Sequence, residues 1–162
     1  MDKQTVIEEI RQNRSKLTER LLKYSLTDTL LFFSDNQALF DEQKQKWNPL
    51  LKWYEDFLQT KIKSTQTLKV DEENLRIVAK LEDVFNNMSD ENFAKVYYLA
   101  CNMRSVALGL AVICGFVDLE KAFDAAFLEE MWQSKEWGED NELAQRRKDL
   151  LNQSKLFLEL FA

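Results

Sequence analysis

The stretch FAKVYYLACNMRSVALGLAVICGF, residues 93 to 116, is the longest apolar segment of the chain. Its apolar residues occupy every side of a helix, and such a helix is stable in water only when neighbouring elements surround it. We therefore predict a central helix over residues 93–114 of an all-α fold. A membrane span is the alternative. Lys95 and Arg104 interrupt the segment, and a central arginine costs about 2.5–3.5 kcal/mol on insertion scales, so no membrane insertion is expected.

The composition of the whole chain agrees with an all-α fold. The chain has 162 residues, of which 45% are hydrophobic and 31% are charged, but only three glycines and one proline. Few tight turns can be built from so little glycine and proline, which disfavours sandwiches and barrels. We expect residues 1–162 to form one compact helical domain, with helices packed at large angles around the central one.

Helical periodicity continues on the amino-terminal side of the central segment. Asp28 follows Thr27 and is expected to cap a short helix in TDTLLFF. Asn48 and Pro49 predict a break or kink at which a new helix starts, because proline suits the first turn of a helix. The polar residues 61–69 are expected to form a linker. The predicted helices cover residues 6–24, 27–33, 35–47, 49–58 and 71–88.

On the carboxy-terminal side, a helix capped by Asp118 is expected to continue through LEEMWQSKEWGED, residues 128 to 140, and to stop at Gly138. A final amphipathic helix should start at residue 140 or 141. Phe127 lies on an apolar stripe that continues through Glu130, then Gln133 or Ser134, and then Trp137, so a carboxylate falls where a core residue is expected. Two plainer interpretations stay open: a helix end that reaches the surface, or a glutamate that extends outward.

The sequence offers little for catalysis. It contains no histidine, which removes the commonest general base and metal ligand, and it has no glycine-rich phosphate loop. Cys101 and Cys114 would lie about 20 Å apart on a straight helix, too far for a disulfide, so they are expected to be reduced core residues. We predict no enzyme activity, no catalytic residue, no metal, no cofactor and no small-molecule substrate. The net charge of −6 argues against nucleic acid as a partner.

Four stretches carry a resemblance to a known family. KYSLTDTLLFF at 23–33, QKWNPLLKWYEDF at 45–57, LACNMRSVALGLAVICGFVDLEKAF at 99–123 and LEEMWQSKEWGED at 128–140 occur in the order and spacing of one family. This is the family of assembly chaperones that hold the alpha subunit of the F-type ATP synthase catalytic head in mitochondria and alphaproteobacteria. The resemblance covers about residues 5–160. It reaches only the helical carboxy-terminal part and not the usual β-rich amino-terminal domain, so the resemblance implies either a reduced or a truncated member.

The resemblance implies a holding function. The chain would bind the free alpha subunit and prevent its aggregation until the beta subunit displaces it. It implies a cytoplasmic location in a bacterium, or the mitochondrial matrix in a eukaryote, although no transit peptide is seen. A structural or adaptor bundle that binds another protein, without catalysis, is the alternative function.

Six residues are candidates for binding the client or for ordering the site. Glu130 and Gln133 match polar positions of the family signature, and Asp28 matches the acid of its Thr-Asp motif. Arg104 projects from an otherwise apolar stripe, so we expect it, or backbone groups, to pair with an inward-facing Glu130. That pairing would fix the helix that presents Trp132, Gln133 and Trp137. A plain surface position for Glu130 is the competing interpretation.

Overall fold

Two short helices, α4 (Asp90–Met103) and α5 (Val106–Ile113), lie at the centre of the fold. The computed structural model describes residues 2–162 and has only helices, turns and loops in that range, apart from one isolated bridge between Phe32 and Thr65. The all-α prediction is therefore confirmed. No helix in residues 2–162 is long and apolar enough to cross a membrane.

The central helix is not continuous, contrary to the prediction. Arg104 adopts a left-handed conformation, with φ 54° and ψ 36°, and ends α4. Ser105 then caps α5, since its Oγ accepts from the Leu108 backbone N–H at 3.0 Å. The chain folds back at this point, so two apolar helices pack against each other. The sequence pattern had suggested one long helix surrounded by its neighbours.

Gly109 allows α4 and α5 to approach closely. A Cβ atom on Gly109 would lie 3.1 Å from the Val96 carbonyl oxygen and 3.3 Å from the Ala100 backbone nitrogen. Only a residue without a side chain fits at this separation without some shift of the neighbouring backbone. The close packing of the two helices therefore depends on this one position.

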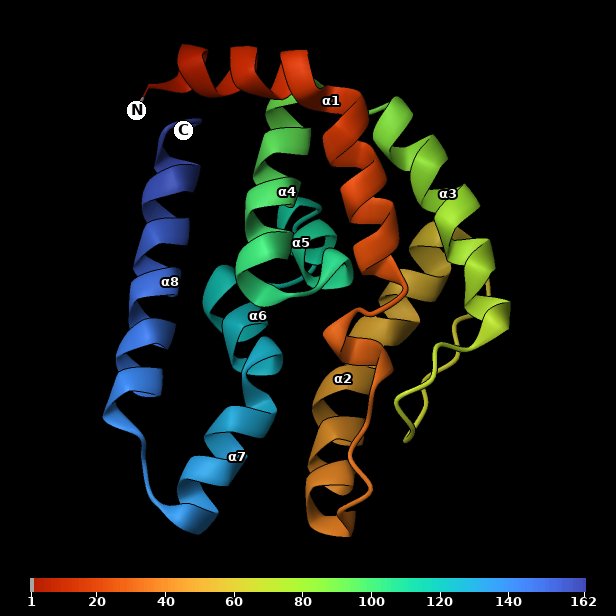
Figure 1. Ribbon diagram of the computed structural model, residues 1–162, viewed down its shortest axis with the longest axis vertical. Helices are drawn as coiled ribbons and strands as arrows, with labels where there is room; N and C mark the ends of the chain where they lie inside the picture. The colour runs from red at the N-terminus through yellow and green to blue at the C-terminus, as the bar shows by residue number, and fades with distance from the viewer. Residues whose placement is uncertain (1) are drawn as a thin grey trace.

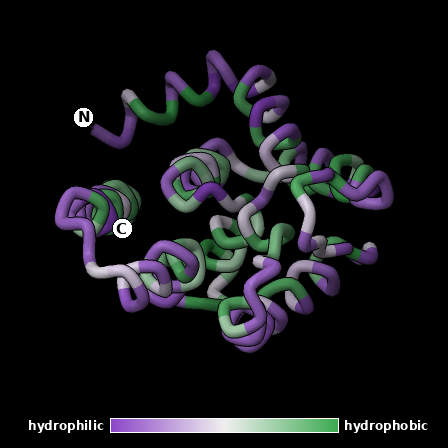
Figure 2. The backbone as a smooth tube through the Cα atoms, turned by 60° about the horizontal axis from the view of Figure 1, so that its bottom comes forward, coloured by the Kyte–Doolittle hydropathy of each residue, from purple (hydrophilic) through white to green (hydrophobic). Residues whose placement is uncertain are grey.

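The other helices surround this centre (Figure 1). The helix α1 (Lys3–Ser25) packs on α4 and on α3 (Leu75–Asn86), while α2 (Gln37–Leu58) packs on α5. The helix α8 (Asn141–Glu159) packs on α4 and on α6 (Leu119–Ala126). In Figure 2 the middle of the molecule is mostly green, whereas the outer helices alternate between green and purple along their length.

The helix α2 runs through Pro49 without interruption, so the prediction of a new helix there is wrong. Proline removes one backbone hydrogen bond, at a cost of about 3 kcal/mol in a helix interior. Buried side chains on both sides offset this cost, among them Trp47 and Tyr54. The Trp47 indole N–H also donates to the Ala125 carbonyl oxygen at 2.9 Å, which ties α2 to α6.

The segment that follows α5 is also divided. The predicted single helix is two helices, α6 and α7 (Leu128–Trp137), because Phe127 leaves the helical conformation at φ −105° and ψ 19°. Gly138 ends α7 as predicted, with φ 94°. The predicted cysteine positions are wrong as well: Cys101 and Cys114 are both exposed free thiols.

Most predicted caps and the predicted linker are present. Asp118 caps α6 and Asp140 caps α8, each by accepting backbone N–H groups of the first turn. Asp28 caps the 3₁₀ helix η1 (Thr29–Leu31), and Asp71 caps the 3₁₀ helix η2 (Glu72–Asn74) that leads into α3. Residues 61–69 lie in the loop between α2 and η2.

Candidate functional site

The helix α7 has two different faces, and each lines a different cavity. Leu128, Met131, Trp132 and Lys135 recur at the spacing of one helix face and line a groove next to α2. Glu129, Glu130 and Gln133 line a cleft next to α8. Only Leu128 is buried among the ten residues of α7. The family signature thus forms a wall between two hollows and not an element of the core.

The cleft between α7 and α8, called the α7/α8 cleft below, has a volume of about 560 Å³. It brings together three of the six residues selected from the sequence: Arg104, Glu130 and Gln133. Its remaining lining comes from η1, the end of α4, the α6–α7 junction and α8, and consists of Thr29, Cys101, Asn102, Met103, Ala126, Phe127, Glu129, Leu143, Arg146, Arg147 and Leu150.

Glu130 is paired, but not with the predicted residue. Its Oε2 accepts from Arg147 Nη1 of α8 at 2.8 Å, and the other guanidinium nitrogen lies 3.5 Å from Glu139 Oε1. The side chains of Arg147 and Glu130 are only 18% and 24% exposed. Arg147 is not among the six candidates chosen from the sequence, although an arginine that replaces an apolar residue on the stripe of α8 was a usable signal. The pair joins α7 to α8 across the cleft.

Arg104 is exposed and has no ion pair within residues 2–162. Its backbone, by contrast, is held firmly. The Arg104 carbonyl oxygen accepts from the Thr29 backbone N–H at 3.1 Å and from the Thr29 hydroxyl at 2.9 Å. A left-handed conformation costs about 1–2 kcal/mol for a residue other than glycine, so these bonds stabilise a strained turn. The turn presents the free guanidinium at the cleft.

Asp28 holds the segments next to this turn by hydrogen bonds and does not line the cleft. Its carboxylate is 1% exposed and accepts from Leu30 N at 3.0 Å and from Ala107 N at 2.9 Å. One side chain therefore caps both η1 and α5. Burial raises the pKa of the Asp28 carboxyl above its ordinary value, although bonds from Ala107, the Ser105 hydroxyl and Leu30 favour the ionised form. Asp28 is thus placed to order the site, one of the two roles expected for it.

The two tryptophans of the signature lie apart from the α7/α8 cleft. Trp132 is half-buried on the opposite face of α7. Trp137 is 83% exposed at the carboxyl end of α7, while Gln133 is exposed at the cleft. The helix that carries all three residues therefore directs Gln133 and Trp132 to different sides.

The cleft suits recognition of a charged protein surface. Three guanidinium groups from Arg104, Arg146 and Arg147 line it together with the carboxylates of Glu129 and Glu130. Arginine offers several planar donors and is favoured in interfaces with carboxylates. Within residues 2–162, no group of three acidic, cysteine or histidine side chains could hold a metal ion.

Comparison with known proteins gives one family and one fold. Residues 2–55 match the family described as "ATP12 chaperone protein". The structure superposes on the crystal structure of Atp12 from Paracoccus denitrificans, with TM-score 0.88 and 24% identity over 98% of this chain and 70% of that one. It also superposes on the structure of a mutant of the same protein, with TM-score 0.89 and 25% identity over 98% of this chain and 69% of that one.

A third solved structure, a protein of Agrobacterium tumefaciens named as a candidate chaperone, has TM-score 0.78 and 25% identity over 96% of this chain and 59% of that one. The resemblance indicated by the four motifs is therefore confirmed, by the family match over the first third of the chain and by the fold over nearly all of it.

Proposed function

We propose that this chain, a relative of the ATP12 chaperones, is an assembly chaperone that holds the free alpha subunit of the F-type ATP synthase catalytic head until the beta subunit displaces it. The family match and the shared fold support a chaperone. The alpha subunit is the partner that the sequence resemblance implies. An unassembled subunit exposes apolar surface and aggregates unless a partner covers that surface.

The observation that carries the proposal is the meeting of three of the four motif stretches at the α7/α8 cleft. Thr29 from the first stretch holds the turn of the third, and that turn places Arg104 opposite Glu130 and Gln133 of the fourth. The second stretch fixes α6, and hence the start of α7, through the bond from Trp47 to Ala125. Segments far apart in the sequence thus cooperate in shaping one solvent-accessible surface.

The mechanism we propose is reversible binding without chemistry. Charged groups at the cleft favour rapid encounter with the client, and a modest interface allows release. Release would come from competition by the beta subunit for the same client surface. The second candidate function, a structural or adaptor bundle, would need neither an aggregating client nor displacement.

Light scattering of refolding alpha subunit, without ATP, tests the proposal. We expect this chain to suppress aggregation at equimolar concentration, and we expect added beta subunit to release it. Absence of suppression at a severalfold excess would reject the chaperone function. Recovery of a different protein, and not the alpha subunit, in co-purification from the native host would favour the adaptor.

A charge reversal tests whether the cleft is the binding surface. Arg104→Glu changes an exposed and unpaired cleft residue, and it should weaken both suppression and co-purification of the alpha subunit. Arg76→Glu is the matched control, because Arg76 is exposed on α3 and lies outside the cleft. Equal activity of the two variants would place the client elsewhere on the molecule.

A further inference from the structure

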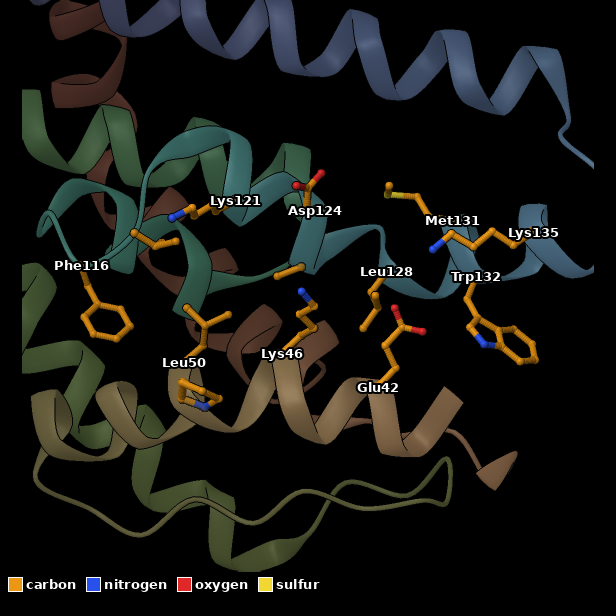
Figure 3. Close-up of a pocket in the computed structure, with 13 residues that line it drawn as sticks. Glu42, Lys46, Leu50, Phe116, Lys121, Asp124, Leu128, Met131, Trp132 and Lys135 are labelled. Carbon is orange, nitrogen blue, oxygen red and sulfur yellow. The ribbon is translucent and has the colours of Figure 1, made fainter. Parts of the chain in front are cut away.

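The second face of α7 borders a hollow of its own, called the α2/α7 groove below. Its volume is about 550 Å³, and Leu50, Phe116, Leu128, Met131 and Trp132 contribute its apolar walls. Figure 3 shows α2 along one side and the α6–α7 segment along the other, with Leu50, Leu128 and Trp132 between them. Because α7 separates this groove from the α7/α8 cleft, the two can be occupied independently.

The groove continues into an exposed aromatic surface on α2. Trp53 stacks on Phe116 with ring centroids 5.5 Å apart and on Phe57 with centroids 5.0 Å apart. Phe57 and Phe116 are 37% and 47% exposed. Along α2, positions 42, 46, 49, 50, 53 and 57 follow one helix face, which at about 1.5 Å per residue spans roughly 22 Å. This length corresponds to about four turns of a second helix.

The charges around the groove differ from those of the chain as a whole. The chain has 22 basic and 28 acidic residues, yet three lysines, Lys46, Lys121 and Lys135, line the groove beside two acids, Glu42 and Asp124. The three lysines are exposed, and none forms an ion pair within residues 2–162. Lys46 extends from α2 toward α6 and α7 (Figure 3).

We propose that the α2/α7 groove binds an amphipathic helix of about four turns from a partner protein, with carboxylates flanking its apolar face. Apolar side chains of that helix would fill the space between Leu50, Met131 and Trp132 and continue onto Trp53 and Phe116, as in other helix-in-groove complexes. Its carboxylates would pair with the three lysines. The site is separate from the α7/α8 cleft, and the proposal does not depend on the identity of the chaperone client.

Designed peptides test the proposal on the full chain. The probe is a fluorescein-labelled 16-residue helix with leucine and phenylalanine on one face and glutamate on both flanks. A second peptide carries lysine in place of each glutamate. Fluorescence anisotropy should show saturable binding of the acidic peptide, with an affinity at least about tenfold higher than that of the basic peptide. Several surface ion pairs together supply a difference of this size. Raised salt should reduce this preference.

Variants locate the binding. Lys46→Glu, Lys121→Glu and Lys135→Glu together should reverse the preference between the two peptides. Lys16→Glu, Lys69→Glu and Lys80→Glu together form the control, because these three lysines are also exposed and lie outside the groove. Binding should change the tryptophan emission of the wild type more than that of Trp132→Phe.

Several results would overturn the proposal. They are equal affinity for the two peptides, equal loss with the control triple variant, and no peptide binding at millimolar concentration. Saturable binding of a fatty acid without peptide binding would assign the groove to a small amphiphile. A dimer in sedimentation that the groove variant dissociates would assign it to a second copy of this chain. If this chain binds the designed peptide but not the alpha subunit, the groove proposal holds and the proposed client is rejected. The two proposals can therefore be tested separately.

Discussion

The helices α5 and α7 have similar lengths but opposite surroundings. α5 buries six of its eight residues, whereas α7 buries one of its ten. α5 is fixed by apolar contacts on all sides, so its substitutions should act mainly on stability. α7 is held by Leu128 and by the ion pair to α8, and both of its other faces are open to solvent. The stretch that resembles the family signature thus lies on a helix that contributes little to the core, where side chains are free to contact a partner.

The largest effect on stability is expected at the contact between α4 and α5. Gly109→Val would place an isopropyl group, a Cβ that carries two methyl groups, against the backbone of Val96 and Ala100. Overpacking of this kind costs about 3 kcal/mol. Gly109→Ala is the internal control. Alanine makes a milder steric contact, and its better helix propensity of about 1 kcal/mol offsets part of the cost of that contact. Urea denaturation measures both. Equal stability of the two variants would contradict the close packing inferred for α5.

A smaller loss is expected below the cleft. Asp28→Ala leaves the buried N–H groups of Leu30 and Ala107 without their acceptor, which costs about 1–3 kcal/mol each. The substitution also removes a buried charge, which offsets part of that cost. We therefore expect a net loss of stability of about 2 kcal/mol. Asp35→Ala, at an exposed position, should change stability by less than about 0.5 kcal/mol.

The same variant has a pH dependence with a definite sign. Burial raises the pKa of Asp28, so the folded state binds the proton more tightly than the unfolded state. The stability contributed by Asp28 is then fully present below the unfolded-state pKa and declines as the pH rises through the folded-state pKa. Urea denaturation should therefore show a larger difference between wild type and Asp28→Ala below pH ~4 than at pH ~7. A difference that grows with pH would contradict the raised pKa.

The ion pair of α7 should matter less for stability and more for binding. Glu130→Lys places a cation beside Arg147, and because the pair is partly exposed, we expect a cost of about 1–2 kcal/mol, between the values for surface and buried pairs. Glu136→Lys, exposed on the same helix, is the control.

The exchange of charges in Glu130→Arg with Arg147→Glu separates the two roles of the pair. Thermal unfolding should show recovered stability, because the attraction is restored. Binding of the alpha subunit should stay weak if the client contacts these groups. Recovery of both properties would assign the pair to structure alone.

The smallest effect on stability is expected at Trp137. Its side chain is 83% exposed, so Trp137→Ala should change the free energy of unfolding by less than about 0.5 kcal/mol. A large exposed aromatic ring is a common anchor for a partner, and Trp137 ends the helix that lines the cleft. We therefore expect weaker co-purification of the alpha subunit. Normal binding together with normal stability would remove Trp137 from the list of candidate client contacts.

Local sequence features determined the helical class and many helix ends. Asp28, Asp118 and Asp140 each cap the element that their position predicted, because a short polar side chain satisfies the free N–H groups of a first turn wherever that turn lies. The order of the four motif stretches indicated the resemblance to the ATP12 chaperones, because that order can be read from the sequence without any tertiary contact. Glu130, Gln133 and Arg104, three of the six candidates chosen from the sequence, line one cleft, and their contact with a client stays a prediction.

Tertiary structure alone decided the breaks, the pairings and the two faces of α7. Periodicity cannot distinguish one long apolar helix from two that reverse at Arg104, because both bury the same residues; the bonds from Thr29 to the Arg104 carbonyl favour the second arrangement. Pro49 stays within α2 because packing on both sides outweighs a local cost. Glu130 pairs with Arg147 and not with Arg104 because the distance between side chains on different helices depends on how the helices pack, and a sequence pattern carries no information about that distance.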